Sequence, residues 1–217
     1  MIRLALFLQL FIVTAFTIEI IQKPIIFNEK RISLTQEYIK SHYGLTVDKI
    51  TIIPKIIVIH HTAFSTLQKS FDDFNPITLS QSRSYISKSS ALNTSAHYMV
   101  DKDGTIYQLM PDNIMARHVI GLNYSSIGIE NVGGENHKDN LTHAQLEANI
   151  KLIKHLKNKY PHIDYVLAHY EYERFSSHPL WLELDKTYRT KKSDPSIRFM
   201  KALRQELKKT NLYFKSH

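Results

Sequence analysis

Uninterrupted apolar runs predict the strands of this chain. Residues 55–61, KIIVIHH, hold four consecutive apolar side chains, which is typical of a strand buried on both faces. Residues 97–110 contain two apolar runs around an Asp-Gly pair and predict a β-hairpin. Residues 125–134 predict a strand that ends in a Gly-Gly turn. Residues 164–170 predict a further strand, which runs into a histidine.

Apolar residues at helical spacing, with capping residues beside them, predict the helices. Residues 142–161 are the clearest case, with a Thr-x-x-Gln capping box and a terminating proline. Residues 33–44 begin with a Ser-x-x-Gln capping box and end on glycine, which predicts a short helix after an extended lead-in over residues 20–32. Residues 64–94 predict a helix and a loop, and residues 196–209 a basic helix. Strands alternating with helices predict an α/β fold, a mixed central β-sheet flanked by helices.

The N-terminal segment favours export. Residues 4–16 are apolar apart from Gln9 and Thr14 and follow a single arginine. The run is shorter than the ~20 residues of a membrane-spanning helix and fits a secretory signal. A buried N-terminal helix is the alternative. Cleavage is left open, because no clear cleavage motif precedes Thr17, and a retained segment would anchor the protein to a membrane. The prediction is a periplasmic or secreted protein.

Charge and cysteine content narrow the partners and the cofactor chemistry. The net charge of +8 favours anionic partners such as nucleic acid, acidic lipid or a cell-wall polymer. No helix-turn-helix, zinc-finger or RNP pattern supports nucleic acid, so we expect none. The chain has no cysteine, which excludes disulfides and thiolate ligands. A metal would have to be held by histidine, aspartate or glutamate.

Two predicted strands run into histidines that are candidates for metal ligation. His60 and His169 follow apolar runs, and active-site crevices of open α/β sheets lie at the carboxyl ends of strands. Together with Asp194 they would make a two-histidine, one-carboxylate set, which is typical of catalytic zinc with one open position. On residue types alone, packed core histidines remain an alternative. His61 is expected to point to the opposite face from His60, because side chains alternate along a strand.

Five motifs in a fixed order resemble a known enzyme family. VIHHTA, SAHYMVDKDGTIYQL, SIGIENVGG, LAHYE and KKSDPS together resemble the N-acetylmuramoyl-L-alanine amidases of the amidase_2 type. This AmpD-like branch is related to peptidoglycan-recognition proteins and phage T7 lysozyme. The resemblance covers about residues 50–205. It implies a bacterial zinc hydrolase that cleaves the amide between N-acetylmuramic acid and L-alanine.

The resemblance also implies roles for individual residues. His60, His169 and Asp194 match the zinc ligands, with aspartate where T7 lysozyme relatives have cysteine. Glu130 in SIGIEN matches the general base, and Lys192 matches the lysine that stabilises the oxyanion. One Zn2+ per chain is therefore expected.

Residues around these motifs extend the expected site. His118 in ARHVIGLN lies near the W-H-A-G loop of the family, and His118, Asn123 and Trp181 are candidates for substrate binding. The two ligands His169 and Asp194 lie 25 residues apart, farther than the family pattern, which indicates an inserted loop at residues 171–190. The insertion predicts a lid, a substrate-binding loop or an element that covers the site. His178 lies inside it as a less favoured alternative ligand.

These observations give one leading hypothesis and two alternatives. The leading one is a zinc amidase of peptidoglycan or muropeptides that acts in cell-wall turnover or remodelling. A cytosolic amidase that recycles 1,6-anhydromuramyl peptides is one alternative, and a non-catalytic peptidoglycan-binding module is the other. The corresponding domains are a signal or anchor at 1–19, an extension at 20–50 and the zinc amidase domain at 51–210.

Overall fold

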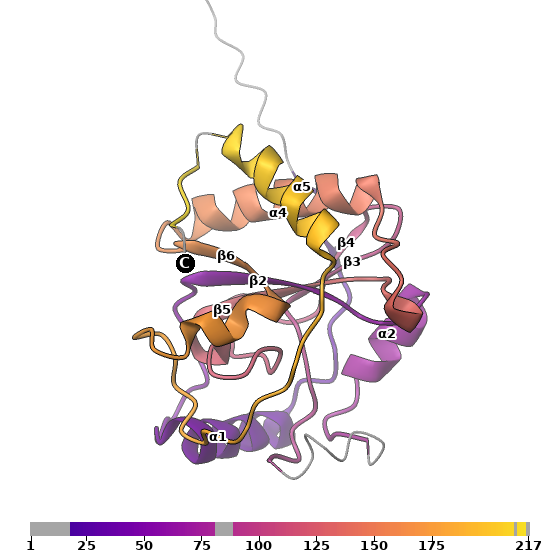
Figure 1. The fold of residues 1–217 in the computed structure, drawn as a ribbon. Coiled ribbons are helices and arrows are strands. Elements are labelled where there is room, and N and C mark those ends of the chain that lie inside the picture. The colour runs from indigo at the N-terminus through magenta and orange to yellow at the C-terminus, as the bar shows by residue number, and fades with distance from the viewer. Residues whose placement is uncertain (1–17, 81–88, 211, 216–217) are drawn as a thin grey trace, which may run out of the picture.

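The computed structural model describes residues 18–80, 89–210 and 212–215. These residues form one six-stranded mixed sheet covered by helices on both faces (Figure 1). The predicted α/β fold with a mixed central sheet is therefore confirmed. The predicted signal segment, residues 1–19, lies almost wholly outside the described residues. No helix in the described part of the chain is both long and apolar enough to cross a membrane.

The two strands that lead to the candidate histidine ligands are neighbours at one edge of the sheet. The sheet order is β1-β4-β3-β5-β2-β6. Strand β2 is parallel to both its neighbours, β5 and β6, and the hairpin β3–β4 is antiparallel. In chain order the strands are β1 (Ile21–Gln22), β2 (Ile56–His61), β3 (Tyr98–Val100), β4 (Ile106–Gln108), β5 (Ser126–Asn131) and β6 (Tyr165–Ala168). The strands predicted from apolar runs and the hairpin are confirmed.

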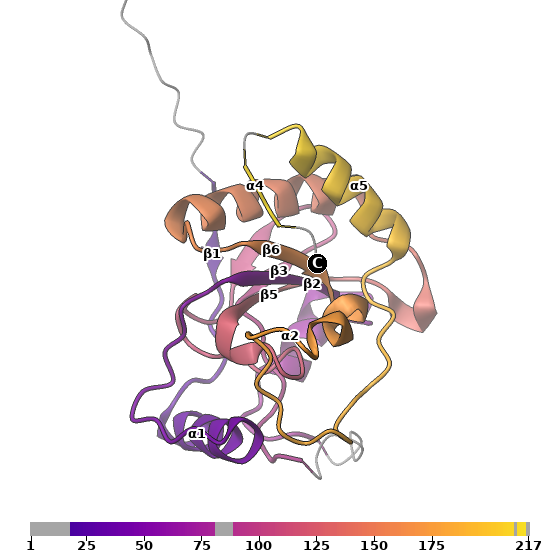
Figure 2. The same cartoon turned by 60° about the vertical axis from the view of Figure 1, so that its left-hand side comes forward.

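Two helices lie on each side of the sheet, and α1 packs on loop residues instead of on the strands. Helices α4 and α5 lie together on one face, and α1 and α2 lie on the other (Figures 1 and 2). The α-helices are α1 (Glu29–Tyr43), α2 (Leu67–Phe74), α4 (His143–Lys159) and α5 (Ile197–Lys208). Short 3-10 helices are η2 (Asn123–Ser125), η3 (Glu135–His137) and η4 (His169–Phe175). The predicted capping box of α4 is confirmed.

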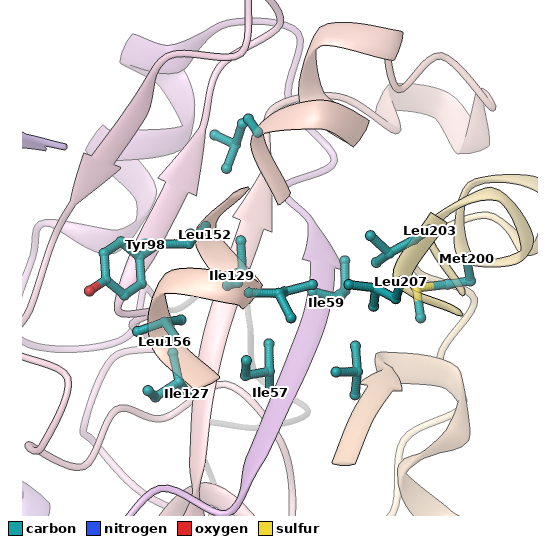
Figure 3. Close-up of a cluster of buried hydrophobic side chains, with 14 of the residues drawn as sticks. Ile57, Ile59, Tyr98, Ile127, Ile129, Leu152, Leu156, Met200, Leu203 and Leu207 are labelled. Carbon is teal, nitrogen blue, oxygen red and sulfur yellow. The ribbon is translucent and has the colours of Figure 1, made fainter. Parts of the chain in front are cut away.

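Side-chain alternation along β2 assigns the two faces. Ile57 and Ile59 belong to the large apolar cluster under α4 and α5 (Figure 3). Ile56 and Val58 belong to the cluster on the opposite face, which also holds Phe175 of η4. His60 continues the second series and His61 the first, as predicted. The ring of His61 lies against Gly134, where an added Cβ would come within 2.3 Å of it.

Two predicted element boundaries are wrong, each because of a side-chain hydrogen bond that the apolar pattern does not show. Helix α1 begins four residues early, because the side chain of Asn28 accepts a hydrogen bond from the backbone N–H of Arg31 and caps it. The predicted capping residue Gln36 instead donates to backbone carbonyls of residues 47 and 48. The strand predicted to include His169 ends at Ala168, whose N–H donates to the side chain of Glu171 at 2.9 Å.

The predicted insertion is tied at both of its ends. The backbone N–H of Tyr170 donates to the carbonyl of Asp194 at 3.1 Å. The hydroxyl of Tyr172 donates to the carbonyl of Thr190 and accepts from its N–H, both at 2.9 Å. These bonds close the loop next to His169 and bring Asp194 back to the sheet.

The middle of the insertion packs on helix α1. The N–H of Leu184 donates to the carbonyl of His42 at 2.9 Å, and the ring of His42 contacts the buried carboxylate of Glu183 at 2.9 Å. Gly44, which ends α1 with a φ of 68°, lies against the side chain of Leu184. The predicted N-terminal extension and the insertion therefore hold each other in place.

We expect the variant Tyr172→Phe to lower the free energy of unfolding by about 1–2 kcal/mol, because both backbone groups of Thr190 lose their partner. Urea unfolding measures this difference. Tyr213→Phe is the matched control, since that ring is 73% exposed, and it should stay within about 0.5 kcal/mol of the wild type. An unchanged free energy of unfolding in Tyr172→Phe would contradict a stabilising role for the two hydrogen bonds between Tyr172 and Thr190.

Candidate metal centre and catalytic groups

Three side chains from distant parts of the chain converge at the ends of β2 and β6. The Nδ1 atoms of His60 and His169 lie 2.9 Å apart. Oδ2 of Asp194 lies 3.0 Å from Nδ1 of His169 and 3.3 Å from Nδ1 of His60. Among the described residues, these three are the only group of at least three histidines and carboxylates that is arranged to hold a metal ion.

The donor set and its spacing fit a zinc ion. Imidazole nitrogen and carboxylate oxygen bind zinc at about 2.0–2.2 Å, so two ligands of a tetrahedral ion lie about 3.3 Å apart. The separations of 2.9 to 3.3 Å among the three ligand atoms come close to this value. Three electron-rich atoms this close together are stabilised by a cation among them.

Burial sets the protonation states of these groups. Burial, together with the neighbouring His169, lowers the pKa of His60 to about 4. Burial would raise the pKa of Asp194, but His169 and His60 outweigh this effect and hold it well below the usual range. At neutral pH the ring of His60 is neutral and Asp194 is ionised. Metal ligation requires these same states.

Glu130 lies beside the three ligands on the neighbouring strand. It pairs with His60 in the parallel register of β2 and β5, so both side chains project from the same face of the sheet. Its side chain is buried, with a residue exposure of 7%. This placement suits the predicted general base. The role itself stays a prediction.

Lys192 lies on the segment without regular secondary structure that leads into Asp194. Its side chain is half-buried, and it lines a small cleft together with His169 and His118. Its charge lowers the pKa of His60, which places the ammonium within electrostatic reach of the ligands. Lys192 can therefore contact a substrate in the cleft, and its role in stabilising the oxyanion stays a prediction.

His118 and Asn123 were predicted to contact substrate, and the structure gives both a place in the cleft wall. The ring of His118 also lies behind His60, with 3.0 Å between Nδ1 of His118 and Nε2 of His60. The side-chain oxygen of Asn123 accepts from the N–H groups of His118 and Val119, both at 2.8 Å. Its amide nitrogen donates to the hydroxyls of Tyr38 and Tyr43, so all its hydrogen bonds shape the loop that carries His118.

Trp181 is held by its own packing partners. Its ring stacks on Tyr172, lies under the guanidinium of Arg189 and covers Gly121, where an added Cβ would come within 2.6 Å. It is not among the residues that line the cleft at His169. Substrate binding by Trp181 stays a prediction, and the structure shows its ring packing the insertion against Gly121.

The alternative ligand His178 is not part of the metal cluster. Its Nδ1 accepts from the N–H of Leu180 at 3.1 Å, and its Nε2 contacts the hydroxyl of Tyr165 at 3.3 Å. Both ring nitrogens thus have partners outside the metal cluster, one in the insertion and one on β6. The ranking of Asp194 above His178 as the third ligand agrees with this geometry.

Sequence reasoning missed two small residues on the site face of β5. Ser126 and Gly128 precede Glu130 at every second position, between Ile127 and Ile129 of the core. An added Cβ at Gly128 would come within 2.7 Å of the ring of His118, so only glycine leaves room for it. The alternation of small and apolar residues in SSIGIEN indicates this feature, because small residues on one face of a strand leave room for a side chain from another segment.

Comparisons with known proteins identify the family of this chain and support its fold. A family model described as N-acetylmuramoyl-L-alanine amidase, Amidase_2, matches residues 51–196. The chain belongs to this family of amidases, whose class of chemistry is hydrolysis of a peptidoglycan amide. No curated protein matches the chain.

Solved structures share the fold at low sequence identity. The chain is similar to the N-acetylmuramoyl-L-alanine amidase LysC from Clostridium intestinale URNW, with 20% identity, a TM-score of 0.53 and coverage of 88% of this chain and 99% of that chain. It is also similar to a selenomethionine derivative of AmpD, with 23% identity, a TM-score of 0.48 and coverage of 70% and 83%. A third likeness is PGRP-SA from Apis mellifera, with 20% identity, a TM-score of 0.44 and coverage of 75% and 98%. The LysC likeness supports the fold.

We expect the free energy of unfolding to fall as the pH drops from about 6.5 to about 4, and His97 to contribute about 3 kcal/mol of that loss. Its Nε2 donates to the carbonyl of Ile114 and its Nδ1 accepts from the N–H of Gly128, so the ring is held neutral. Burial lowers the pKa of His97 to about 4. The unfolded chain takes up this proton first, so the stability is complete above about 6.5 and is lost on acidification.

An NMR titration of His97, alongside urea unfolding at several pH values, tests this expectation. The His97 ring signals should not shift until the pH approaches 4. The variant His97→Gln is the control, because its unfolding should depend less on pH in this range. A His97 ring that titrates near pH 6.5 in the folded protein would contradict the analysis.

Proposed function

We propose that this protein is a zinc-dependent N-acetylmuramoyl-L-alanine amidase that hydrolyses peptidoglycan or muropeptides. The observation that carries the proposal is the convergence of His60, His169 and Asp194, with separations of 2.9 to 3.3 Å between their ligand atoms. Membership of the amidase family supports the reaction, and the donor set supports the metal.

His60, His169 and Asp194 would hold the zinc ion. A bound zinc ion acts as a Lewis acid and brings the pKa of water close to neutrality. Glu130 would accept the proton that the attacking water releases as its oxygen bonds to the lactyl carbonyl carbon. Glu130 would then pass this proton to the nitrogen of L-alanine as the C–N bond breaks.

Lys192 supplies the positive charge on the cleft side of the reaction. As the carbonyl oxygen gains negative charge, an ammonium group close to it stabilises that charge more than it stabilises the neutral amide. Lys192 lines the cleft next to His169, so the substrate carbonyl can lie between the lysine and the ligand cluster. In this proposal Glu130 on β5 acts as the base, and Lys192, on the segment before Asp194, supplies the positive charge.

We further propose export and a role in cell-wall turnover or remodelling. The apolar segment of residues 4–16 supports export, and the net charge of +8 supports attraction to an anionic wall polymer. A cytosolic enzyme that recycles anhydromuramyl peptides would need no such segment. Detecting the protein in the periplasmic or culture fraction of its own cells would support export, and finding it only in the cytosol would favour the recycling alternative.

Substitutions at the metal ligands and the base should separate binding of zinc from hydrolysis. We expect Asp194→Ala to lose both stoichiometric zinc and activity, because a carboxylate ligand is removed. We expect Glu130→Gln to keep one zinc per chain and to lose about 10²–10⁴-fold in kcat, because only the proton acceptor is removed. Zinc content is measured by elemental analysis, and hydrolysis by release of L-alanine amino termini from muropeptides.

The variant His178→Ala is the matched control, because it removes an imidazole of the insertion that lies outside the cluster. It should keep zinc and activity. Stoichiometric zinc in Asp194→Ala would place the third ligand elsewhere. A wild-type chain that retains muropeptides without cleaving them would favour the binding-module alternative.

A further inference from the structure

A chain of hydrogen bonds leads from the candidate ligand His60 into the protein interior. Nε2 of His60 lies 3.0 Å from Nδ1 of His118. Nε2 of His118 lies 3.2 Å from Oγ of Ser126, and this hydroxyl donates to the backbone carbonyl of Leu122 at 2.8 Å. All three polar side chains are buried, with exposures of 1% for His60, 8% for His118 and 0% for Ser126.

The last member fixes the direction of every bond in this chain. A carbonyl oxygen only accepts, so the hydroxyl hydrogen of Ser126 points to Leu122. The oxygen of Ser126 is then the acceptor for an N–H at Nε2 of His118. Nδ1 of the neutral His118 ring consequently carries a lone pair and accepts the N–H at Nε2 of His60. This leaves Nδ1 of His60 unprotonated and facing His169 and Asp194.

The ring of His118 has little freedom to leave this position. It packs on the Cα of Gly128, where an added Cβ would come within 2.7 Å of it. It meets the ring of His60 edge-to-face, with 5.1 Å between the centroids, and the ring of His97 lies 5.8 Å away in the same manner. Asn123 holds the backbone of residues 118 and 119 through two 2.8 Å hydrogen bonds. The acceptor is therefore preorganised.

We propose that His118 is a positioning residue of the metal site, which orients His60 and directs its Nδ1 lone pair toward the ion through the relay from Leu122 by way of Ser126. This inference rests on the proposed function, since it concerns the same zinc site. His118 thus accepts a hydrogen bond from the candidate ligand His60, in addition to its place in the cleft wall. Outer partners of this kind typically change metal affinity by about 10–100-fold when they are removed.

A pair of variants with the same side-chain shape isolates the acceptor. Asparagine and leucine have the same branched skeleton, but only asparagine places an oxygen near the position of Nδ1 of His118. We expect His118→Leu to raise the dissociation constant for zinc by about tenfold or more, and His118→Asn to recover most of the loss. The measurement is zinc competition against a chelator with the full chain. The visible spectrum of the cobalt-loaded forms reports the ligand geometry directly.

Ser126→Ala tests the relay without changing the ring, and it serves if His118→Leu fails to fold. It should weaken zinc binding in the same direction but by less than His118→Leu, with unchanged unfolding of the metal-free chain as the check on folding. Equal zinc affinities and equal cobalt spectra for His118→Leu, His118→Asn and the wild type would overturn the inference and leave the proposed function standing. Equal weakening in both His118 variants would also overturn it. A wild-type chain that binds no zinc would overturn the proposed function and this inference with it.

Discussion

The site depends on holding two imidazole nitrogens and one carboxylate oxygen about 3 Å apart in a buried place. Such a group is costly without a cation, because each atom loses water and faces its neighbours' electron density. The sheet meets part of this requirement, since the parallel strands β2 and β6 end side by side, with His60 near the end of β2 and His169 directly after the last residue of β6. The remaining candidate ligand, Asp194, comes from outside the sheet, and its position depends on the inserted segment.

Hydrogen bonds between the two ends of the inserted segment set the position of Asp194. Asp194 follows His169 by 25 residues, yet the bond from Tyr170 to its carbonyl and the clamp between Tyr172 and Thr190 bring it back to the ligand that precedes it. A loop whose ends are fixed can be long without disturbing what lies beyond it. The middle of this loop packs on α1 through Glu183 and His42. The structure therefore shows the insertion packed on α1, which does not favour a freely moving lid.

Local patterns predicted the parts of this protein that are determined locally. The apolar runs located the strands, the Thr142–Gln145 capping box located α4, and five ordered motifs indicated the three candidate ligands, Glu130 and Lys192. The start of α1 and the end of β6 were wrong, because each is set by a side-chain hydrogen bond that periodicity does not report. The contact between His60 and His118 and the packing of Trp181 on Gly121 join segments far apart in the sequence, so only the folded chain reveals them.

The central claim is that the ligand cluster performs metal-dependent hydrolysis of one particular amide bond. Mass spectrometry of the products from purified muropeptides tests it most directly, with the full chain as isolated, after chelation and after zinc is restored. The account predicts free peptides that begin with L-alanine, together with intact N-acetylmuramic acid, in the first and third samples and none in the second. Cleavage that persists after the metal is removed, or that occurs at another bond, would contradict it.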